Sequence, residues 1–124
     1  MSKELEVGLQ LHKSGDFAKA EAVYKGILRY EPDHAEALHF LGLLSYQSGE
    51  NLEAIGYIEK AISLNPSSAI MANNLGLAFQ AMGNVEAACS AYRQAIEANP
   101  RLPSAYNNLA NTLREIGNFE EAIT

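Results

Sequence analysis

Residues 83–100 read GNVEAACSAYRQAIEANP, a run that begins with glycine, ends with proline and carries apolar residues at helical spacing. Gly83 can adopt the left-handed conformation that closes a preceding helix, and Asn84 is a residue type that caps the next one. Pro100 prevents the helix from continuing, because proline lacks an amide hydrogen and clashes with the preceding turn. The run therefore predicts one bounded helix over about residues 85–98.

The same punctuation recurs every 34 residues along the chain. Glycine falls at positions 15, 49, 83 and 117, alanine at 20, 54, 88 and 122, and proline at 32, 66 and 100. This period predicts one domain over residues 1–124, made of repeats 1–34, 35–68, 69–102 and a truncated fourth repeat, 103–124. Each repeat is expected to hold two helices, at about positions 1–14 and 17–30. The residues expected to cap the second helices are Asp16, Asn51, Asn84 and Asn118.

Small residues recur at two positions where paired helices would have to approach closely. Position 8 of the repeats holds Gly8, Gly42, Gly76 and Ala110, and position 20 holds Ala20, Ala54, Ala88 and Ala122. A larger side chain in either series would separate the helices and open voids between them. The pattern therefore predicts tightly packed helix pairs.

This pattern resembles the tetratricopeptide repeat (TPR) family. The resemblance is carried in the third repeat by Leu75, Gly76, Phe79, Ala88, Tyr92, Ala95 and Pro100. It implies an all-α fold, a right-handed superhelix or α-solenoid of antiparallel helix pairs. The first helix of each pair would line a concave groove, and the second would form the convex side.

Two adjacent asparagines occur in residues 72–76, ANNLG, and again in residues 106–110, YNNLA. Asparagine is a poor helix former, because its side chain competes for backbone hydrogen bonds. In a TPR array these positions would lie on or near the groove, where amides could hold the backbone of an extended peptide. They could equally bridge neighbouring repeats and serve only structure. The predicted groove residues are His39, Leu43, Tyr46, Asn73, Asn74, Leu77, Asn107, Asn108 and Asn111.

Three of these groove residues carry alternatives of their own. For His39, a solvated surface position is the leading expectation and a hydrogen bond to a ligand the alternative. For Leu43 and Leu77, packing against neighbouring first helices is the leading expectation and contact with a ligand the alternative.

The resemblance implies a protein–protein interaction module, and the chain is expected to be a fragment of a larger protein. One alternative is a structural or oligomerisation scaffold. Another is the substrate-docking N-terminal region of a glycosyltransferase-like enzyme, because the repeats are similar to the superhelical region of O-linked N-acetylglucosamine transferases. Asn74 and Asn108 match the asparagine ladder of that region, whereas Glu6 and Phe40 do not.

TPR domains that bind chaperone C-termini use a clamp of lysine, arginine and asparagine. The resemblance places the clamp at His39, Leu43, Asn74, Ser104 and Asn108. Only Asn74 has the residue type that the clamp requires, and without cations a terminal carboxylate has little to pair with. We expect no binding of chaperone tails by this clamp.

Composition narrows the class of partner. The net charge of −6 and the pI of about 5.0 argue against nucleic acid. No apolar run reaches the ~20 residues that span a bilayer, so no membrane is expected. Cys89 is the only cysteine, and the three histidines lack metal-binding spacing. We expect no cofactor, no metal, no enzymatic activity and a cytoplasmic location.

The truncated fourth repeat leaves apolar residues without the helix that would cover them. We expect a homo-oligomer to form through this C-terminal end, because exposed apolar faces tend to find partners. In the alternative, the first helix of this repeat is itself the cap and only the short stub frays. The predicted self-association surface comprises Tyr106, Leu109, Leu113, Ile116 and Phe119.

Overall fold

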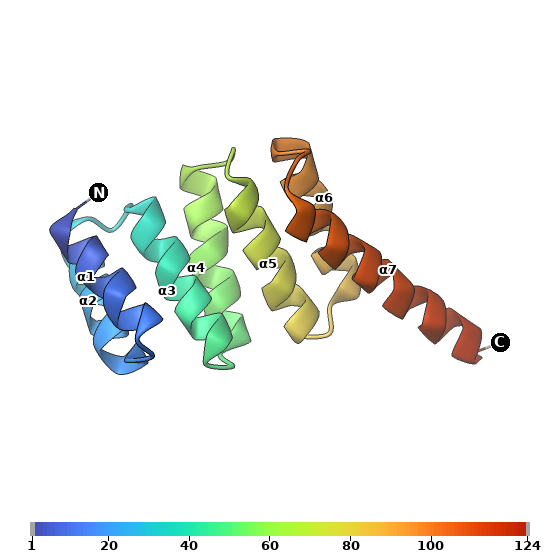
Figure 1. Cartoon of the computed structure of the whole chain (residues 1–124), viewed down its shortest axis with the longest axis horizontal. Coiled ribbons are helices and arrows are strands. Elements are labelled where there is room, and N and C mark those ends of the chain that lie inside the picture. The colour runs from blue at the N-terminus through green and yellow to red at the C-terminus, as the bar shows by residue number, and fades with distance from the viewer. Residues whose placement is uncertain (1, 124) are drawn as a thin grey trace. The chain divides into compact units, whose positions relative to one another are not determined.

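The computed structural model describes residues 2–123 of the chain and the side chains of residues 2–117. Within that range all regular secondary structure is α-helical (Figure 1). The helices are α1 (Lys3–Lys13), α2 (Phe17–Tyr30), α3 (Ala35–Gln47), α4 (Asn51–Leu64), α5 (Ala69–Ala81), α6 (Val85–Ala98) and α7 (Pro103–Ile123). The all-α class and the helix pairs predicted from the repeat are confirmed, and the first six helices end close to the predicted positions.

Glycine closes the first helix of each complete repeat. Gly15, Gly49 and Gly83 have φ angles of 84°, 82° and 82°, which favour glycine because it lacks a Cβ atom. The amide after each glycine donates back to a carbonyl of the last helical turn, at 2.9 Å from Asp16 to Leu11 and 3.0 Å from Asn84 to Phe79. These bonds are those of a Schellman motif, so the chain reverses within a few residues.

The predicted caps are confirmed in the first and third repeats, and the cap predicted for the second repeat is wrong. Side-chain oxygens of Asp16 and Asn84 accept from backbone amides three residues later, at 3.4 Å and 3.2 Å. In the second repeat the N-cap is Glu50, which makes no side-chain capping bond, and Asn51 is already the first helical residue. The capping position directly follows the glycine, and glutamate occupies it there.

The described residues form two compact units, one that ends at Pro66 and one that begins at Ser67. In the first unit, α1 packs on α2 and α3 packs on α4. A Cβ atom at Gly8 would lie 2.6 Å from a ring carbon of Tyr24, and one at Gly42 would lie 2.5 Å from Ile58. The predicted close approach at position 8 is confirmed, because each glycine leaves room for a large buried side chain of the paired helix.

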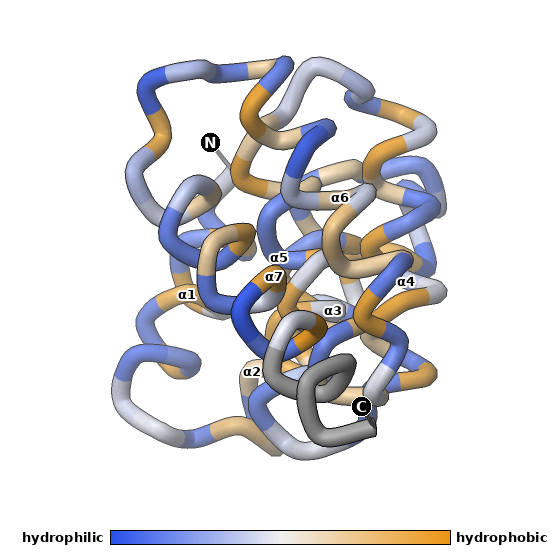
Figure 2. Tube along the Cα trace, turned by 90° about the vertical axis from the view of Figure 1, so that its right-hand side faces the viewer, coloured by the Kyte–Doolittle hydropathy of each residue, from blue (hydrophilic) through white to orange (hydrophobic). Residues whose placement is uncertain are grey.

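In the second unit, α5 packs on α6, and α7 packs mainly on α6. The ring of Tyr92 lies so close to Gly76 that a Cβ atom there would overlap it. Ala72, Ala95 and Ala105 form a small apolar cluster that joins the three helices, with Ile96 and Leu102 packed against it. Figure 2 shows how apolar and polar residues alternate along the traces of the individual helices.

The predicted reversal in the fourth repeat is wrong. Residues 103–123 form the single helix α7, and Gly117 lies inside it without a positive φ angle. A reversal at Gly117 would be favoured if the helix after it buried an apolar side against the helix before it. The residues after Gly117 could form only one or two helical turns, which would bury little apolar surface. Continuing the helix satisfies the backbone locally. The side chains of Asn118 and Ala122, which were expected to act in the second helix, lie outside the described part of the chain.

Candidate peptide-binding surfaces

Asn73 connects two helices of the second unit rather than facing an open groove. Its side chain is 7% exposed. Its Nδ2 donates to Ser104 Oγ at 3.4 Å, and its Oδ1 accepts from Asn108 Nδ2 at 3.1 Å. The two asparagines thereby tie α5 to α7. Of the two roles considered for the asparagine pairs, these bonds fit the structural one, and ligand contact by either residue stays a prediction.

The other predicted groove asparagines of this unit are less buried than Asn73. Asn107 and Asn111 on α7 are exposed, and Asn74 on α5 is partly buried. The Oδ1 atom of Asn111 accepts from Arg114 Nη2 at 2.9 Å, within the same helix. Leu77, the remaining predicted residue of α5, is partly buried. Two exposed amides thus lie one turn apart on α7, and an amide can both donate and accept.

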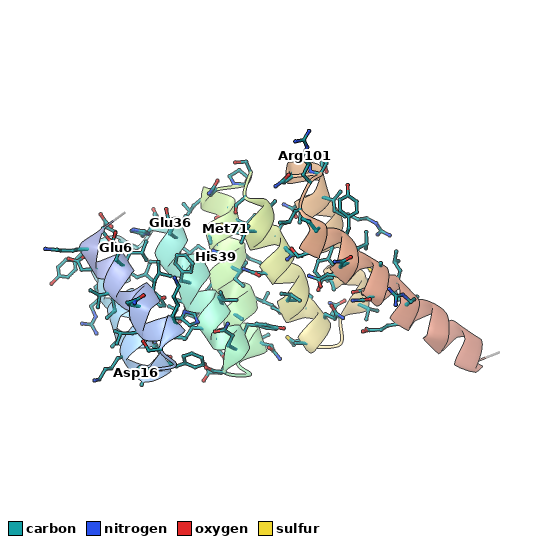
Figure 3. The ribbon with its side chains drawn as sticks, in the orientation of Figure 1. Glu6, Asp16, Glu36, His39, Met71 and Arg101 are labelled. Atoms are coloured by element: carbon teal, nitrogen blue, oxygen red, sulfur yellow. The ribbon has the colours of Figure 1, made fainter. Side chains whose placement is uncertain are left out.

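His39, in the first unit, is not the solvated residue that we expected. It is 6% exposed, and its ring stacks on Phe40 with centroids 5.3 Å apart. Figure 3 labels His39 on the ribbon. Burial lowers the pKa of His39 from 6.5 to about 4, because the charged imidazolium loses its hydration. A histidine five residues into a helix gives no sequence signal that separates a buried position from an exposed one.

Leu43 and Tyr46 lie on the same helix, α3, and both are partly buried. Leu43 lines an open hollow of about 440 Å³ in the first unit, which we call the α1–α3 hollow. The lining residues are Leu9, His12, Lys13, Phe17, Phe40, Leu43 and Gln47. Sequence reasoning included only Leu43 among the predicted site residues. It missed Phe17 and Lys13, which stand at either side of a turn and become neighbours of α3 only in the fold.

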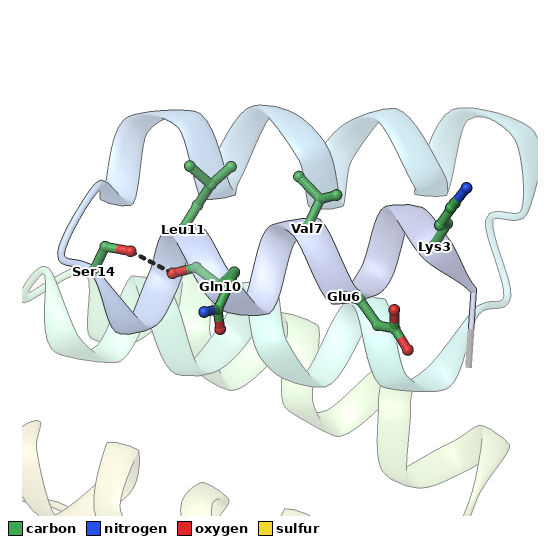
Figure 4. Close-up of a pocket in the computed structure, with 6 residues that line it drawn as sticks. All are labelled: Lys3, Glu6, Val7, Gln10, Leu11 and Ser14. Atoms are coloured by element: carbon green, nitrogen blue, oxygen red, sulfur yellow. Dashed lines mark hydrogen bonds between the residues drawn. The ribbon is translucent and has the colours of Figure 1, made fainter.

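A second hollow, of about 500 Å³, lies along the outer side of α1 (Figure 4). All of its lining residues come from this one helix and the residue that caps it, namely Lys3, Glu6, Val7, Gln10, Leu11 and Ser14. Ser14 Oγ donates to the Gln10 carbonyl at 2.6 Å, which satisfies the helix end. Because no second element contributes, this hollow offers few convergent groups to a ligand.

A tyrosine-centred hydrogen-bond network occurs at the same repeat positions in both units. In the first unit, His12 Nδ1 lies 3.2 Å from the Tyr24 hydroxyl, and His12 Nε2 lies 2.5 Å from Gln47 Oε1. Because the amide oxygen of Gln47 accepts, Nε2 is the donor of this pair, and a ring protonated on Nε2 alone accepts at Nδ1 from the tyrosine. Burial raises the pKa of Tyr24 to about 12. The network fixes one wall of the α1–α3 hollow.

The counterpart in the second unit is built from different residues. The Tyr92 hydroxyl donates to Gln80 Oε1 at 2.6 Å, and Gln80 Nε2 donates to Glu115 Oε1 at 3.1 Å. In each unit a tyrosine of the second helix thus reaches a polar residue of its own first helix and, through it, the next first helix. This network holds successive first helices in register.

The predicted self-association surface is only partly open. Tyr106 and Leu113 are 46% and 44% exposed, whereas Leu109 and Ile116 are partly buried. The side chain of Phe119 lies outside the described residues. The open part is therefore a stripe of Tyr106, Ala110 and Leu113 along one side of α7.

The structure adds two observations that concern membranes and metals. Among residues 2–123, no helix is both long and apolar enough to cross a membrane. Among the side chains of residues 2–117, no three histidines, cysteines, aspartates or glutamates gather as metal ligands would. Cys89 is buried.

Family models for the tetratricopeptide repeat match residues 8–69, 69–102 and 91–124, so the chain belongs to the TPR family. Among solved structures, that of MamA is 30% identical in sequence to this chain and superposes on it with a TM-score of 0.83. The match covers 94% of this chain and 68% of MamA. The O-GlcNAc transferase of Thermobaculum terrenum (mutant K341M) has 29% identity and a TM-score of 0.85. That match covers 91% of this chain but only 23% of the transferase.

The first TPR domain of Spaghetti (RPAP3), bound to the HSP90 peptide SRMEEVD, shares the fold at a TM-score of 0.88. Its identity is 20%, over 92% of this chain and 90% of that chain. A likeness at this identity shows the fold and not the ligand. No curated protein matches the chain.

Proposed function

We propose that this chain binds an extended segment of another protein through the first helices of its repeats, and that it acts by binding rather than by catalysis. The observation that supports this most directly is the exposed pair Asn107 and Asn111 on α7. Two uncharged amides one turn apart suit the donors and acceptors of a peptide backbone. We assign ligand contact to the exposed Asn107 and Asn111, because Asn73 and Asn108 bond to each other between helices.

Peptide phage display with random dodecapeptides tests this function, followed by fluorescence anisotropy of the enriched peptides. The double variant Asn107→Ala/Asn111→Ala should bind at least about fivefold more weakly, because it loses two to three hydrogen bonds worth ~0.5–1.5 kcal/mol each. Gln94→Ala, an exposed amide on α6, is the matched control and should bind normally. If the wild-type protein selects no peptide, the proposal fails.

The proposed peptide binding does not use the clamp that holds chaperone C-termini. The clamp positions hold His39, Leu43 and Ser104 where cations or amides are needed, and His39 is buried. We therefore retain the prediction that peptides ending in EEVD do not bind tightly, although the structure of Spaghetti holds such a peptide.

Two alternatives rest on specific observations. The exposed stripe of Tyr106, Ala110 and Leu113 supports a homo-oligomer formed through α7. The 29% identity to the Thermobaculum terrenum transferase supports a substrate-docking region of a larger, glycosyltransferase-like enzyme. The cytoplasmic location and the single domain over residues 1–124 stay predictions from the sequence.

A further inference from the structure

The α1–α3 hollow lies entirely within the first unit and draws its lining from three segments. Leu9, His12 and Lys13 come from α1, Phe17 begins α2, and Phe40, Leu43 and Gln47 come from α3. Its volume of about 440 Å³ is within the range of pockets that enclose small ligands or large side chains. The hollow is thus a convergent site.

Its floor is apolar and already supported by the core. Leu9, Phe17 and Phe40 pack on one side against the buried cluster that includes Tyr24 and Leu41. All three are only partly buried, as is Leu43, so their other sides remain accessible. An apolar side chain placed on this floor would remove more of this surface from water.

One wall is fixed before any ligand arrives. His12 is held by Tyr24 and by Gln47, and its ring meets Phe17 edge to face with centroids 5.4 Å apart. Because these contacts restrain the imidazole from several directions, a ligand would not have to order this wall. A preformed wall lowers the entropic cost of binding.

The α1–α3 hollow carries a positive charge, whereas the chain as a whole is negatively charged. The chain carries 15 acidic and 9 basic residues, yet the seven lining residues include Lys13 and no carboxylate. Among the described side chains, no aspartate or glutamate pairs with the Lys13 ammonium. The lining therefore presents an available cation beside an apolar floor.

We propose that the α1–α3 hollow binds one large apolar side chain of a partner segment that carries an acidic residue next to it. The apolar side chain covers Leu9, Phe40 and Leu43, and the neighbouring carboxylate pairs with Lys13. This inference rests on the proposed peptide-binding function and deepens it, because it defines the chemistry of the segment.

Four capped hexapeptides in a glycine–serine background test the proposal. They carry phenylalanine followed by glutamate, phenylalanine followed by lysine, serine followed by glutamate, or serine followed by lysine. Binding is followed by NMR from the methyl signals of Leu9 and Leu43. Phenylalanine should bind about tenfold more tightly than serine, and glutamate about threefold more tightly than lysine in the phenylalanine pair.

Substitutions at Lys13 and Leu43 test whether these residues recognise the peptide or only support the fold. Lys13→Glu should reverse the preference, so that the phenylalanine–lysine peptide binds more tightly than the phenylalanine–glutamate peptide. Lys3→Glu changes the net charge equally outside this hollow and should leave the preference unchanged. Leu43→Ser should weaken binding of the phenylalanine peptides about tenfold. Leu52→Ser, at an exposed position of α4, should not.

Two outcomes would overturn the inference. One is equal binding of all four peptides to a folded wild-type protein. The other is a preference that Lys13→Glu leaves unchanged while circular dichroism shows normal helicity. If peptides selected by phage display still bind in a manner that depends on Asn107 and Asn111, the proposed function stands and only the assignment of the hollow fails.

Discussion

At the scale of single residues, the contact of Gly76 with Tyr92 sets the distance between α5 and α6. The tyrosine ring is fully buried and lies where a Cβ atom of residue 76 would be. Gly76→Ala should therefore destabilise the fold by roughly 1–3 kcal/mol, because the buried ring would have to shift to admit the methyl group. Urea unfolding followed by circular dichroism measures this change.

The same substitution elsewhere supplies the control. A Cβ atom at Gly56, in the middle of α4, would meet nothing within 4 Å. Gly56→Ala should stabilise the protein by roughly 0.5–1 kcal/mol, since alanine is the better helix former. Equal effects of the two substitutions would contradict the packing described for position 8.

The burial of His39 should make the stability of the protein depend on pH. Its pKa is about 4 in the folded state, against the 6.5 of an exposed histidine side chain. Between these pH values the unfolded chain binds a proton that the folded chain does not, so stability falls as pH falls from 6.5 to 4. The loss from this residue is at most about 3 kcal/mol. The measurement is the free energy of unfolding at several pH values.

His39→Gln removes the titrating group and should flatten this part of the profile. Above pH 7 its effect should be the same at every pH, because the histidine is neutral in both states. If the wild type and His39→Gln lose stability in parallel between pH 6.5 and 4, the buried neutral histidine is not the cause.

At the scale of elements, the amide bridge of Asn73 joins α5 to α7. Asn73→Ala should destabilise the protein by about 1–3 kcal/mol, because Ser104 and Asn108 lose a partner beside a buried position. Asn107→Ala, at an exposed position, should change stability by less than about 0.5 kcal/mol. Thermal melting of both variants measures the difference, and equal melting temperatures would contradict the bridging role.

The continuous helix α7 gives a second prediction for an element. Gly117 lies inside the helix, so Gly117→Ala should stabilise it by roughly 0.5–1 kcal/mol. At Gly83 the φ angle is 82°, and Gly83→Ala should destabilise by roughly 1–2 kcal/mol. Far-UV circular dichroism during heating distinguishes the two. A loss of stability for both variants would mean that Gly117 forms a turn after all.

The ends of the first six helices could be predicted because their signals are local. Glycine at a positive φ angle and proline after a helix act within a few residues. The course of α7 depends instead on whether a second helix can pack back, which no local signal at Gly117 reveals. The burial of the candidate site residues was likewise not predictable from local sequence alone. Asn73 and Asn74 differ by one residue, and hence by about 100° around α5, which is enough to bury one and leave the other partly accessible.

At the scale of the whole molecule, the stripe on α7 predicts self-association. Sedimentation should show a weight-average mass that rises with protein concentration, because Tyr106 and Leu113 are exposed on one side of the helix. Tyr106→Ser/Leu113→Ser should lower that mass toward the monomer. Leu52→Ser replaces an exposed leucine outside the stripe and is the control. A strictly monomeric wild type at high concentration would contradict the prediction.

The buried hydroxyl of Tyr24 gives the protein an intrinsic optical reporter. The chain has six tyrosines and no tryptophan, so near-ultraviolet absorption comes mainly from phenol rings. An exposed phenol becomes phenolate near pH 10, whereas Tyr24, with a pKa of about 12, stays protonated in the folded unit. Its late absorbance change, absent from Tyr24→Phe, would therefore record the opening of α1 and α2 without any added label.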